Sequence, residues 1–213
     1  MKAEYIDHMG SDLSVVNAAR VSFDKHHEIF TDGDEKLINY LATHKHELPF
    51  AHTAITLRMT APIPIRTQCF KSKIGFVENE VSRRYVSTMP KYFTPKAWRL
   101  KADNKKQGSD DKPLDNQDDI AALYNAACKV VIQAYNLMLA EGVCPEQARF
   151  ILPQGVMTSW IWTGSLLAFS RFYKLRVDDH AQKEVQDLAK MVENIIAPLY
   201  PHSWKALVKI NNK

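Results

Sequence analysis

The chain has 213 residues, of which 46% are hydrophobic, and a formal net charge of +4 from 28 basic and 24 acidic side chains. This length suits one large domain or two small ones, with enough apolar residues for a full core. The excess of positive charge permits anionic ligands but is too small to indicate nucleic-acid binding. No apolar run approaches the roughly 18 residues of a membrane span, and the N-terminus lacks the apolar core of a signal peptide. We therefore expect a soluble, cytoplasmic protein that binds neither membranes nor nucleic acid.

The cysteines give no sign of a disulfide framework or a zinc knuckle. Cys69, Cys128 and Cys144 are odd in number, and no two of them have the CxxC spacing. Cys69 invites comparison with a catalytic nucleophile, but no His or other general base is placed to activate it. We expect Cys69 to be a small buried hydrophobic residue.

The first part of the chain predicts helices and a strand. A short helix opens near the N-terminus, where Ser11 or Asp12 is a credible N-cap. Apolar residues on one face predict a second helix over 34–44. Residues 52–60 alternate between apolar and polar side chains, which is typical of a half-buried strand. A Pro-containing turn then leads into a helix over 66–73.

Three histidines, His44, His46 and His52, fall within nine positions and invite a metal site. Their spacing argues against one, because His44 and His46 do not share a helix face and no HExxH pattern is present. We favour a structural role for His52 over metal coordination.

Positive charge is concentrated between residues 66 and 85, around a short polar stretch at 78–82. Arg offers a planar fork for phosphate oxygens and Lys a mobile point charge, so this cluster suits a phosphate-bearing ligand. The alternative is a solvated, salt-bridged helix end. Ser82 has no visible His and Asp partners, so a hydrolase triad is not indicated.

The remaining chain is predicted to be mainly helical. Residues 86–100 are aromatic and Pro-punctuated, which favours an irregular covering segment, and 101–119 are polar enough for an exposed, mobile loop. Apolar residues at helical spacing predict a helix over 118–142, which we interpret as core scaffold. The run 160–169 predicts the start of another helix, and 180–199 a long amphipathic one closed by prolines.

Asp178, Asp179 and His180 stand at the start of that last helix. They allow the metal ligands of a nucleotide hydrolase, but acidic residues at a helix start are more simply N-terminal caps. Trp204 and Leu207 are expected to dock the C-terminal tail. Helices and strands alternate irregularly and no GxGxxG is present, so the predicted fold class is α+β and not a Rossmann fold.

Several stretches resemble the flavin-dependent thymidylate synthase (ThyX) family, and together they cover most of the chain. Residues 71–73 and 79–85 stand where the family has Arg-His-Arg, a spacer, and Ser followed by Gly-Arg-Tyr; here the triplet is Lys-Ser-Lys and the spacer is one residue longer. Residues 148–153 match the family's Ala-Arg-x-x-Leu-Pro, and 175–184 match its Leu-Arg-x-x-x-His-Ala-Gln-x-Glu. Residues 18–24 resemble its N-terminal segment.

The resemblance assigns roles to individual residues. It implies that substrate is bound by Gln68, Lys71, Glu80, Ser82, Arg83, Arg84, Arg149 and Arg176. It implies that the cofactor is bound by Ser22, His46, Lys71, Ser72, Lys73, Glu80, Ser165 and Arg171. Arg176 is also implied to be catalytic, because a guanidinium against the uracil ring stabilises negative charge there and makes carbon 5 nucleophilic. No metal is implied.

The family's fold is implied for a single domain over 1–213: a small antiparallel sheet packed by long helices, in a homotetramer with active sites at subunit interfaces. The implied reaction is the reductive methylation of dUMP to dTMP with FAD, methylenetetrahydrofolate and NADPH. The altered triplet, with changes at Ser165 and Arg171, leaves alternatives open. These are a flavin enzyme that modifies another pyrimidine nucleotide such as dCMP or adds hydroxymethyl, a metal-dependent nucleotide hydrolase, and a nucleotide-binding protein without flavin.

Overall fold

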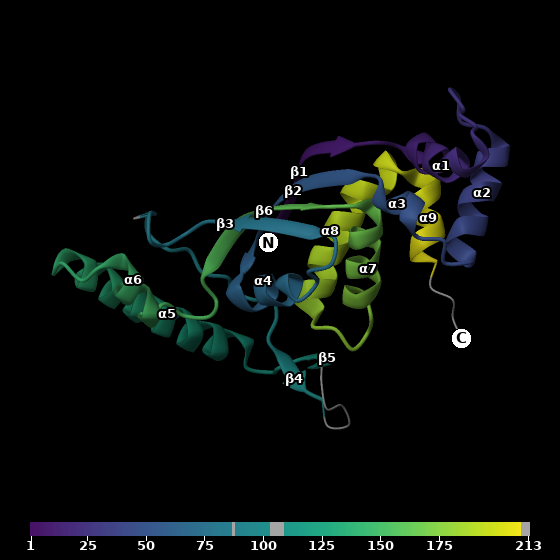
Figure 1. The fold of residues 1–213 in the computed structure, drawn as a ribbon. Helices are drawn as coiled ribbons and strands as arrows, with labels where there is room; N and C mark the ends of the chain where they lie inside the picture. Colours follow the sequence, from purple (N-terminus) through teal and green to yellow (C-terminus); the bar gives the residue numbers. More distant parts are fainter. Residues whose placement is uncertain (87, 103–108, 210–213) are drawn as a thin grey trace.

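The computed structural model describes residues 1–86, 88–102 and 109–209. A four-stranded antiparallel sheet lies at its centre, with helices packed against one face (Figure 1). The strands pair in the order β1 (Lys2–Met9), β2 (Ala54–Pro62), β6 (Met157–Gly164) and β3 (Phe76–Glu80). This arrangement confirms the α+β class. In the part of the chain that is described, no helix is both long and apolar enough to cross a membrane.

The predicted strand over 52–60 is confirmed as β2. Its alternate side chains are fully buried, at Ile55, Leu57, Met59 and Ala61. The polar side chains between them lie on the other face, where Thr56 and Thr163 hydroxyls hydrogen-bond across to β6 at 3.0 Å. The sheet therefore has one apolar face for the core and one polar face.

The helix predicted to start at Trp160 is wrong, because this segment is strand β6. Trp160 and Trp162 are buried while Ile161 between them is 38% exposed, which is the two-residue period of a strand. Bulky aromatic and β-branched residues favour a pleated surface. The helix itself, α7 (Leu166–Arg176), begins after Gly164, where the Ser165 side chain caps it.

The outer strands β1 and β3 were not predicted from the sequence. Most of β1 is exposed and it contains a bulge near Ile6, so its side chains show no clean alternation. β3 includes the first residues of the polar stretch 78–82, around which a phosphate-binding cluster was predicted. Its position depends on Gly164, where an added Cβ would lie 2.4 Å from the ring of Phe76.

Helices account for most of the rest of the described chain. They are α1 (Asp12–Arg20), α2 (Asp32–Thr43), α3 (Leu48–Ala51), α4 (Ile63–Phe70), α5 (Gln117–Ala140), α6 (Pro145–Ala148), α7, α8 (Lys183–Leu199) and α9 (Pro201–Val208), with short 3₁₀ helices η1 (Val21–Phe23) and η2 (Arg149–Ile151). Ser11 is the N-cap of α1, as predicted. Helix α4 begins earlier than predicted, because Pro64 fits its first turn.

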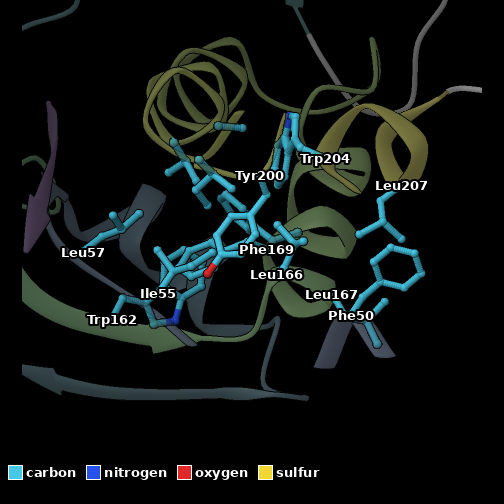
Figure 2. Packing of buried hydrophobic residues seen from close by; sticks show 14 of the residues in the cluster. Phe50, Ile55, Leu57, Trp162, Leu166, Leu167, Phe169, Tyr200, Trp204 and Leu207 are labelled. Carbon is cyan, nitrogen blue, oxygen red and sulfur yellow. The ribbon is translucent and has the colours of Figure 1, made fainter. Parts of the chain in front are cut away.

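The core lies between the apolar sheet face and helices α7, α8 and α9 (Figure 2). The Trp162 ring stacks on Phe76 with centroids 4.3 Å apart and meets Phe169 and Phe172 edge-on. Trp204 and Leu207 of α9 are buried, which confirms that the tail docks. The chain ends are joined as well, since the buried Asp12 carboxylate accepts hydrogen bonds from the His202 and Ser203 amides at 2.9 Å.

The interpretation of the helix over 118–142 as core scaffold is wrong for most of its surface. Helix α5 extends away from the sheet together with α6 (Figure 1). Only Cys128, Ile132 and Tyr135 are buried along it, among the residues described. Leu123 and Val130, which were expected to face the core, are 68% and 63% exposed.

Two further expectations are corrected, one for the segment 101–119 and one for the start of helix α8. The exposed loop predicted over 101–119 is partly a hairpin, in which β4 (Arg99–Lys101) pairs with β5 (Ser109–Pro113); its residues 103–108 lie outside the described residues. Helix α8 starts at Lys183 with Gln182 as N-cap, so Asp178 and Asp179 do not cap it. Asp178 instead accepts a hydrogen bond from the His180 amide in the preceding turn.

Candidate active site

Eight of the residues predicted to form a site line three separate cavities of this chain. We name the cavities after what borders them: the Arg176 cavity, of about 470 Å³, the β3 cavity, of about 730 Å³, and the α2 cavity, of about 950 Å³. Volumes of this size suit parts of a nucleotide or cofactor. Six predicted substrate residues divide between the first two cavities, and two predicted cofactor residues line the third.

The Arg176 cavity brings together Arg176, predicted to act on the uracil ring, and Gln68, predicted to bind the substrate nucleotide. Arg176 ends α7, and its Nη2 donates a 2.6 Å hydrogen bond to the backbone oxygen of Gln68 on α4. The Gln68 side chain in turn donates from Nε2 to Oε1 of Gln182 at 2.7 Å. Both side chains line the cavity. One guanidinium edge is thus anchored, which orients the remaining donors of Arg176.

A half-buried ion pair lies at the edge of this cavity, which Arg99 helps to line. Arg99 of β4 donates from both terminal nitrogens to the two carboxylate oxygens of Glu184, at 2.8 and 3.0 Å. Burial acts to raise the pKa of the Glu184 carboxyl, but hydrogen bonds from Arg99 and Gln182 outweigh it and hold that pKa below 4.5. The carboxylate therefore stays ionised at neutral pH.

The β3 cavity collects a second group of predicted residues. Glu80, Ser82, Arg83 and Arg149 all line it. Glu80 is fixed at the end of β3, because its Oε1 accepts a 2.7 Å hydrogen bond from Thr158 and lies 3.1 Å from Nε of Arg66. The cavity thus has a carboxylate, which can accept hydrogen bonds from ligand hydroxyls, and several cations, which can bind a negatively charged group.

One more predicted cation, Arg84, contacts the same helix as Arg149. Arg84 forms an ion pair with Glu146 of α6, and Arg149 donates from Nε to the Glu146 backbone oxygen at 3.3 Å. The Ser82 hydroxyl accepts a hydrogen bond from the Arg84 amide at 3.2 Å. Glu146 therefore contacts two guanidinium groups, of the kind that bind phosphate.

The Lys71-Ser72-Lys73 triplet lines none of the three cavities. It connects α4 to β3, where Lys73 forms an ion pair with Glu78 and lies 5.0 Å from the Phe70 ring centroid. Lys71 is exposed. The Ser72 hydroxyl oxygen is buried without a hydrogen-bond partner among the described residues, so it has capacity for a ligand or water.

The α2 cavity contains Ser22 and His46 but not the other predicted cofactor residues. Aromatic Phe23 and Tyr40 and the charged Glu47 also line it. Arg171 reaches its edge through an ion pair with Glu47. Ser165 is elsewhere, where its Oγ accepts the Ala168 amide at 3.2 Å as the cap of α7.

Neither a cysteine nucleophile nor a metal cluster is formed in the part of the chain that is described. Burial raises the pKa of the Cys69 thiol to about 12, although the charge of Arg176 acts to lower it. Cys69 is fully buried, which confirms the expected hydrophobic role. The described residues hold no group of three or more His, Cys, Asp or Glu side chains arranged for a metal ion.

Three residues that shape the Arg176 cavity were not predicted to have a role. Gln182 and Glu184 stand inside the quoted motif 175–184, so the signal was present but no function was attached to it. Arg99 gave no signal, because only the β4–β5 hairpin brings it to α8.

The whole chain is similar to known proteins. The family described as "Thymidylate synthase complementing protein" matches residues 4–202. The flavin-dependent thymidylate synthase of Thermus thermophilus is 33% identical over 201 residues, covering 94% of this chain and 73% of the relative. That of Thermosipho africanus is 34% identical over 211 residues, covering 98% and 91%.

Solved structures give the same fold. The UMP/dUMP methylase PolB from Streptomyces cacaoi, bound with 5-Br dUMP, has a TM-score of 0.87 at 28% identity and covers 96% of this chain and 93% of PolB. PolB bound with 5-Br UMP gives a TM-score of 0.86 at 26% identity, with 97% and 93% covered.

Proposed function

The chain belongs to the flavin-dependent thymidylate synthase family, and from this premise we propose that it catalyses the reductive methylation of dUMP to dTMP. The likeness to a methylase bound with a dUMP analogue supports dUMP as the substrate. The observation that carries the proposal is the Arg176 cavity, in which Gln68 anchors a guanidinium beside an open volume.

We assign the work on the base to Arg176. Its cationic donors would hydrogen-bond a uracil carbonyl and stabilise the negative charge that develops on the ring as carbon 5 attacks a one-carbon unit. Gln68 fixes the guanidinium, so little reorganisation is needed during the reaction. The one-carbon donor in this proposal is methylenetetrahydrofolate, and the reductant is NADPH.

We assign the nucleotide phosphate to the cations beside β3. Arg84 and Arg149 meet at Glu146, and Ser82 adds a hydroxyl to the same surface. Arg83 donates to the Thr88 backbone oxygen at 2.6 Å, which holds the segment after β3 in place. Glu80 would orient the sugar or the cofactor from the end of β3.

The chain offers groups that fit a flavin. The α2 cavity combines the Ser22 hydroxyl, the His46 imidazole and aromatic side chains. The triplet at 71–73 provides two cations and a buried hydroxyl that has no hydrogen-bond partner among the described residues. FAD bound to these residues would supply the electrons that complete the methyl group. The residues themselves would bind its phosphates and hold its ring.

The proposed site is built from more than one subunit. The Arg176 and β3 cavities are separate in a single chain, although both are assigned to one nucleotide. A homo-oligomer, in this family a homotetramer, would place the β3 residues of one copy beside Arg176 of another. We also propose that residues 1–213 act as one domain, because one buried cluster runs from Val15 to Leu207.

The direct test is dTMP formation by the purified protein with dUMP, FAD, methylenetetrahydrofolate and NADPH. We expect turnover in the wild type and a loss of roughly 10²- to 10³-fold in kcat for Arg176→Ala, the size measured for one charge-stabilising donor. Flavin absorbance should be retained in the variant. Lys174→Ala, which removes an exposed cation from the same helix, is the matched control.

Two outcomes would contradict different parts of this proposal. No dTMP from the wild type would refute the activity, whereas normal turnover by Arg176→Ala would refute only the role of Arg176. A second candidate substrate is UMP, favoured by the similarity to PolB bound with 5-Br UMP. Assaying UMP and dUMP in parallel decides between the two nucleotides.

A further inference from the structure

A line of hydrogen bonds runs from the β4–β5 hairpin to the Arg176 cavity. Arg99 donates to both oxygens of Glu184, and Gln182 donates from Nε2 to Oε2 of the same carboxylate at 2.9 Å. Gln182 then accepts on Oε1 from Nε2 of Gln68 at 2.7 Å. We refer to Glu184, Gln182 and Gln68 as the amide relay.

The chemistry of these groups fixes the direction of every bond in the relay. An ionised carboxylate only accepts hydrogen bonds, so Gln182 must turn its NH₂ toward Glu184. The carbonyl oxygen of Gln182 is then left to face Gln68, so Gln68 must donate to it from its own NH₂. Oε1 of Gln68 is left without a hydrogen-bond partner among the described residues, and the Gln68 side chain lines the same cavity as Arg176.

Glu184 is well held for this role. Its side chain is 12% exposed and that of Arg99 is 20% exposed, and the two meet through paired hydrogen bonds. Such a fork-to-fork contact restrains the carboxylate in one orientation. Gln182 is itself exposed, so its amide needs an external restraint to keep one orientation.

We propose that Glu184 is a specificity-determining positioning residue, which makes the Arg176 cavity present one acceptor, Oε1 of Gln68, beside the donors of Arg176. This pattern complements an imide edge, in which an N–H is flanked by carbonyl oxygens, as in uracil. Cytosine has an unprotonated ring nitrogen at that position, so two acceptors would face each other. The inference rests on the proposed nucleotide function and adds the means by which uracil is selected over cytosine.

Glu184→Gln is the informative variant because it should release the relay. Oε2 of Glu184 accepts from both Arg99 and Gln182, so either orientation of the new amide sets its NH₂ against one guanidinium nitrogen of Arg99, which has only donors. The paired contact is then lost, Gln182 and Gln68 are no longer held in one orientation, and Gln68 also offers NH₂ to the ligand. We expect the ratio of the dCMP and dUMP dissociation constants to fall by about tenfold, the size of one exchanged hydrogen bond.

Calorimetric titration of wild type and variants with dUMP, dCMP and N3-methyl-dUMP measures this ratio. Gln182→Leu breaks the relay while keeping the Arg99–Glu184 pair, and should also reduce discrimination. Asp187→Asn removes another carboxylate from α8, one paired with Lys183 at the surface, and should leave the ratio unchanged. Discrimination that survives in both relay variants, or N3-methyl-dUMP that binds as well as dUMP, would overturn the proposal. A 3′-deoxy analogue tests whether Oε1 instead meets the sugar hydroxyl, which would overturn it too.

A second readout needs no nucleotide. The side-chain ¹⁵N–¹H resonances of Gln68 report whether its NH₂ is hydrogen-bonded, and we expect them to shift and exchange faster in Glu184→Gln and Gln182→Leu but not in Asp187→Asn. Unchanged Gln68 resonances would overturn the relay. If the resonances change as expected but the protein binds no uracil nucleotide, the relay stands, whereas both uracil recognition and the proposed function are refuted.

Discussion

At the scale of single residues, Cys69 shows how burial removes a chemical possibility. Its thiol lies on α4 next to Gln68, one residue from a proposed substrate contact, yet it is fully buried. With the thiol pKa raised to about 12, almost no thiolate exists at neutral pH. A nucleophile at this position would need to be exposed and ionised, and Cys69 is neither.

We therefore predict that Cys69 is inert in the folded protein. Iodoacetamide at pH 8 should label the exposed Cys144 and leave Cys69 unmodified until the protein is denatured, as measured by mass spectrometry of peptides. Cys69→Ala should keep dTMP formation. Loss of turnover without loss of folding would show that the thiol takes part in the chemistry.

Asp34 gives a prediction on pH, because its buried carboxylate is surrounded by donors. Burial acts to raise its pKa, but hydrogen bonds from Thr31 and His27 and the charge of Arg20 hold it below 3.8. A depressed folded pKa stabilises the protein above pH 3.8, and that stability is lost as the pH falls through the folded value.

The measurement is urea unfolding of wild type and Asp34→Asn at pH 6 and below pH 3. The wild type should be more stable at pH 6 by roughly 2 kcal/mol, as for a buried hydrogen-bonded charge, and the difference should shrink at low pH. Asp32→Asn, an exposed carboxylate in the same first turn of α2, serves as the comparison. A difference that does not depend on pH would mean that Asp34 contributes by shape alone.

How far the site could be predicted depends on the distance between its parts. Motif residues close in sequence, such as Ser82, Arg83 and Arg84, come together because one turn after β3 carries them. The pairing of Arg176 with Gln68 joins α7 to α4 across 108 positions, and no local pattern predicts such a contact. No local pattern predicts that the triplet at 71–73 lies outside the cavities either, because its position depends on the register in which β3 pairs with β6.

At the scale of elements, helix α5 has apolar residues on two opposite faces. Cys128, Ile132 and Tyr135 pack inward, while Leu123, Val130 and Leu137 recur every seven residues on the other side and are 68%, 63% and 61% exposed. Helices that are apolar on all sides are normally buried. The exposed stripe is therefore the surface that we propose to pack against another copy of the chain.

We predict that charge on this stripe dissociates the oligomer. The double variant Val130→Glu and Leu137→Glu should reduce the mass seen by light scattering after gel filtration and lower dTMP formation at least tenfold, because the proposed site needs two subunits. Lys129→Glu, at the flank of the same helix, should assemble normally. A double variant with wild-type mass would show that the stripe is not an interface.

The errors in predicting elements have the same physical origin. The helix α5 was predicted, but the face assigned to the core is the exposed one, because apolar residues recur on two faces of α5 and their spacing does not tell which face packs inside the chain. For β6, a run of apolar residues before Ser165 fitted a helix as well as a strand, and pairing with β2 and β3 on both sides decided it. The α+β class was predictable because β2 and the long helices have strong periods of their own.

At the scale of the whole molecule, the sheet and the helices beneath it form a stable frame with proposed site residues at separate edges. Arg176 is the last residue of α7, whereas Arg84 follows β3 and is paired with Glu146 of α6, and Figure 1 shows α7 and α6 at different sides of the sheet. Within a single chain, the Arg176 cavity and the β3 cavity are separate, so neither cavity holds all the residues assigned to the nucleotide. Activity should therefore belong to the assembly, not to the subunit.

This leads to a complementation prediction. Arg176→Ala and Arg84→Ala should each be nearly inactive as pure proteins, but co-expressing them with different tags and purifying the mixed oligomer should restore activity. If one site takes Arg176 from one subunit and Arg84 from another, about one quarter of the sites in a random mixture keep both arginines. The control is a mixture of Arg176→Ala with Gln68→Ala, which change two side chains of the same cavity, so no site keeps both side chains when both come from one chain. Recovery near a quarter in the first mixture and none in the second requires a shared site, because a site within one chain would remain inactive in both.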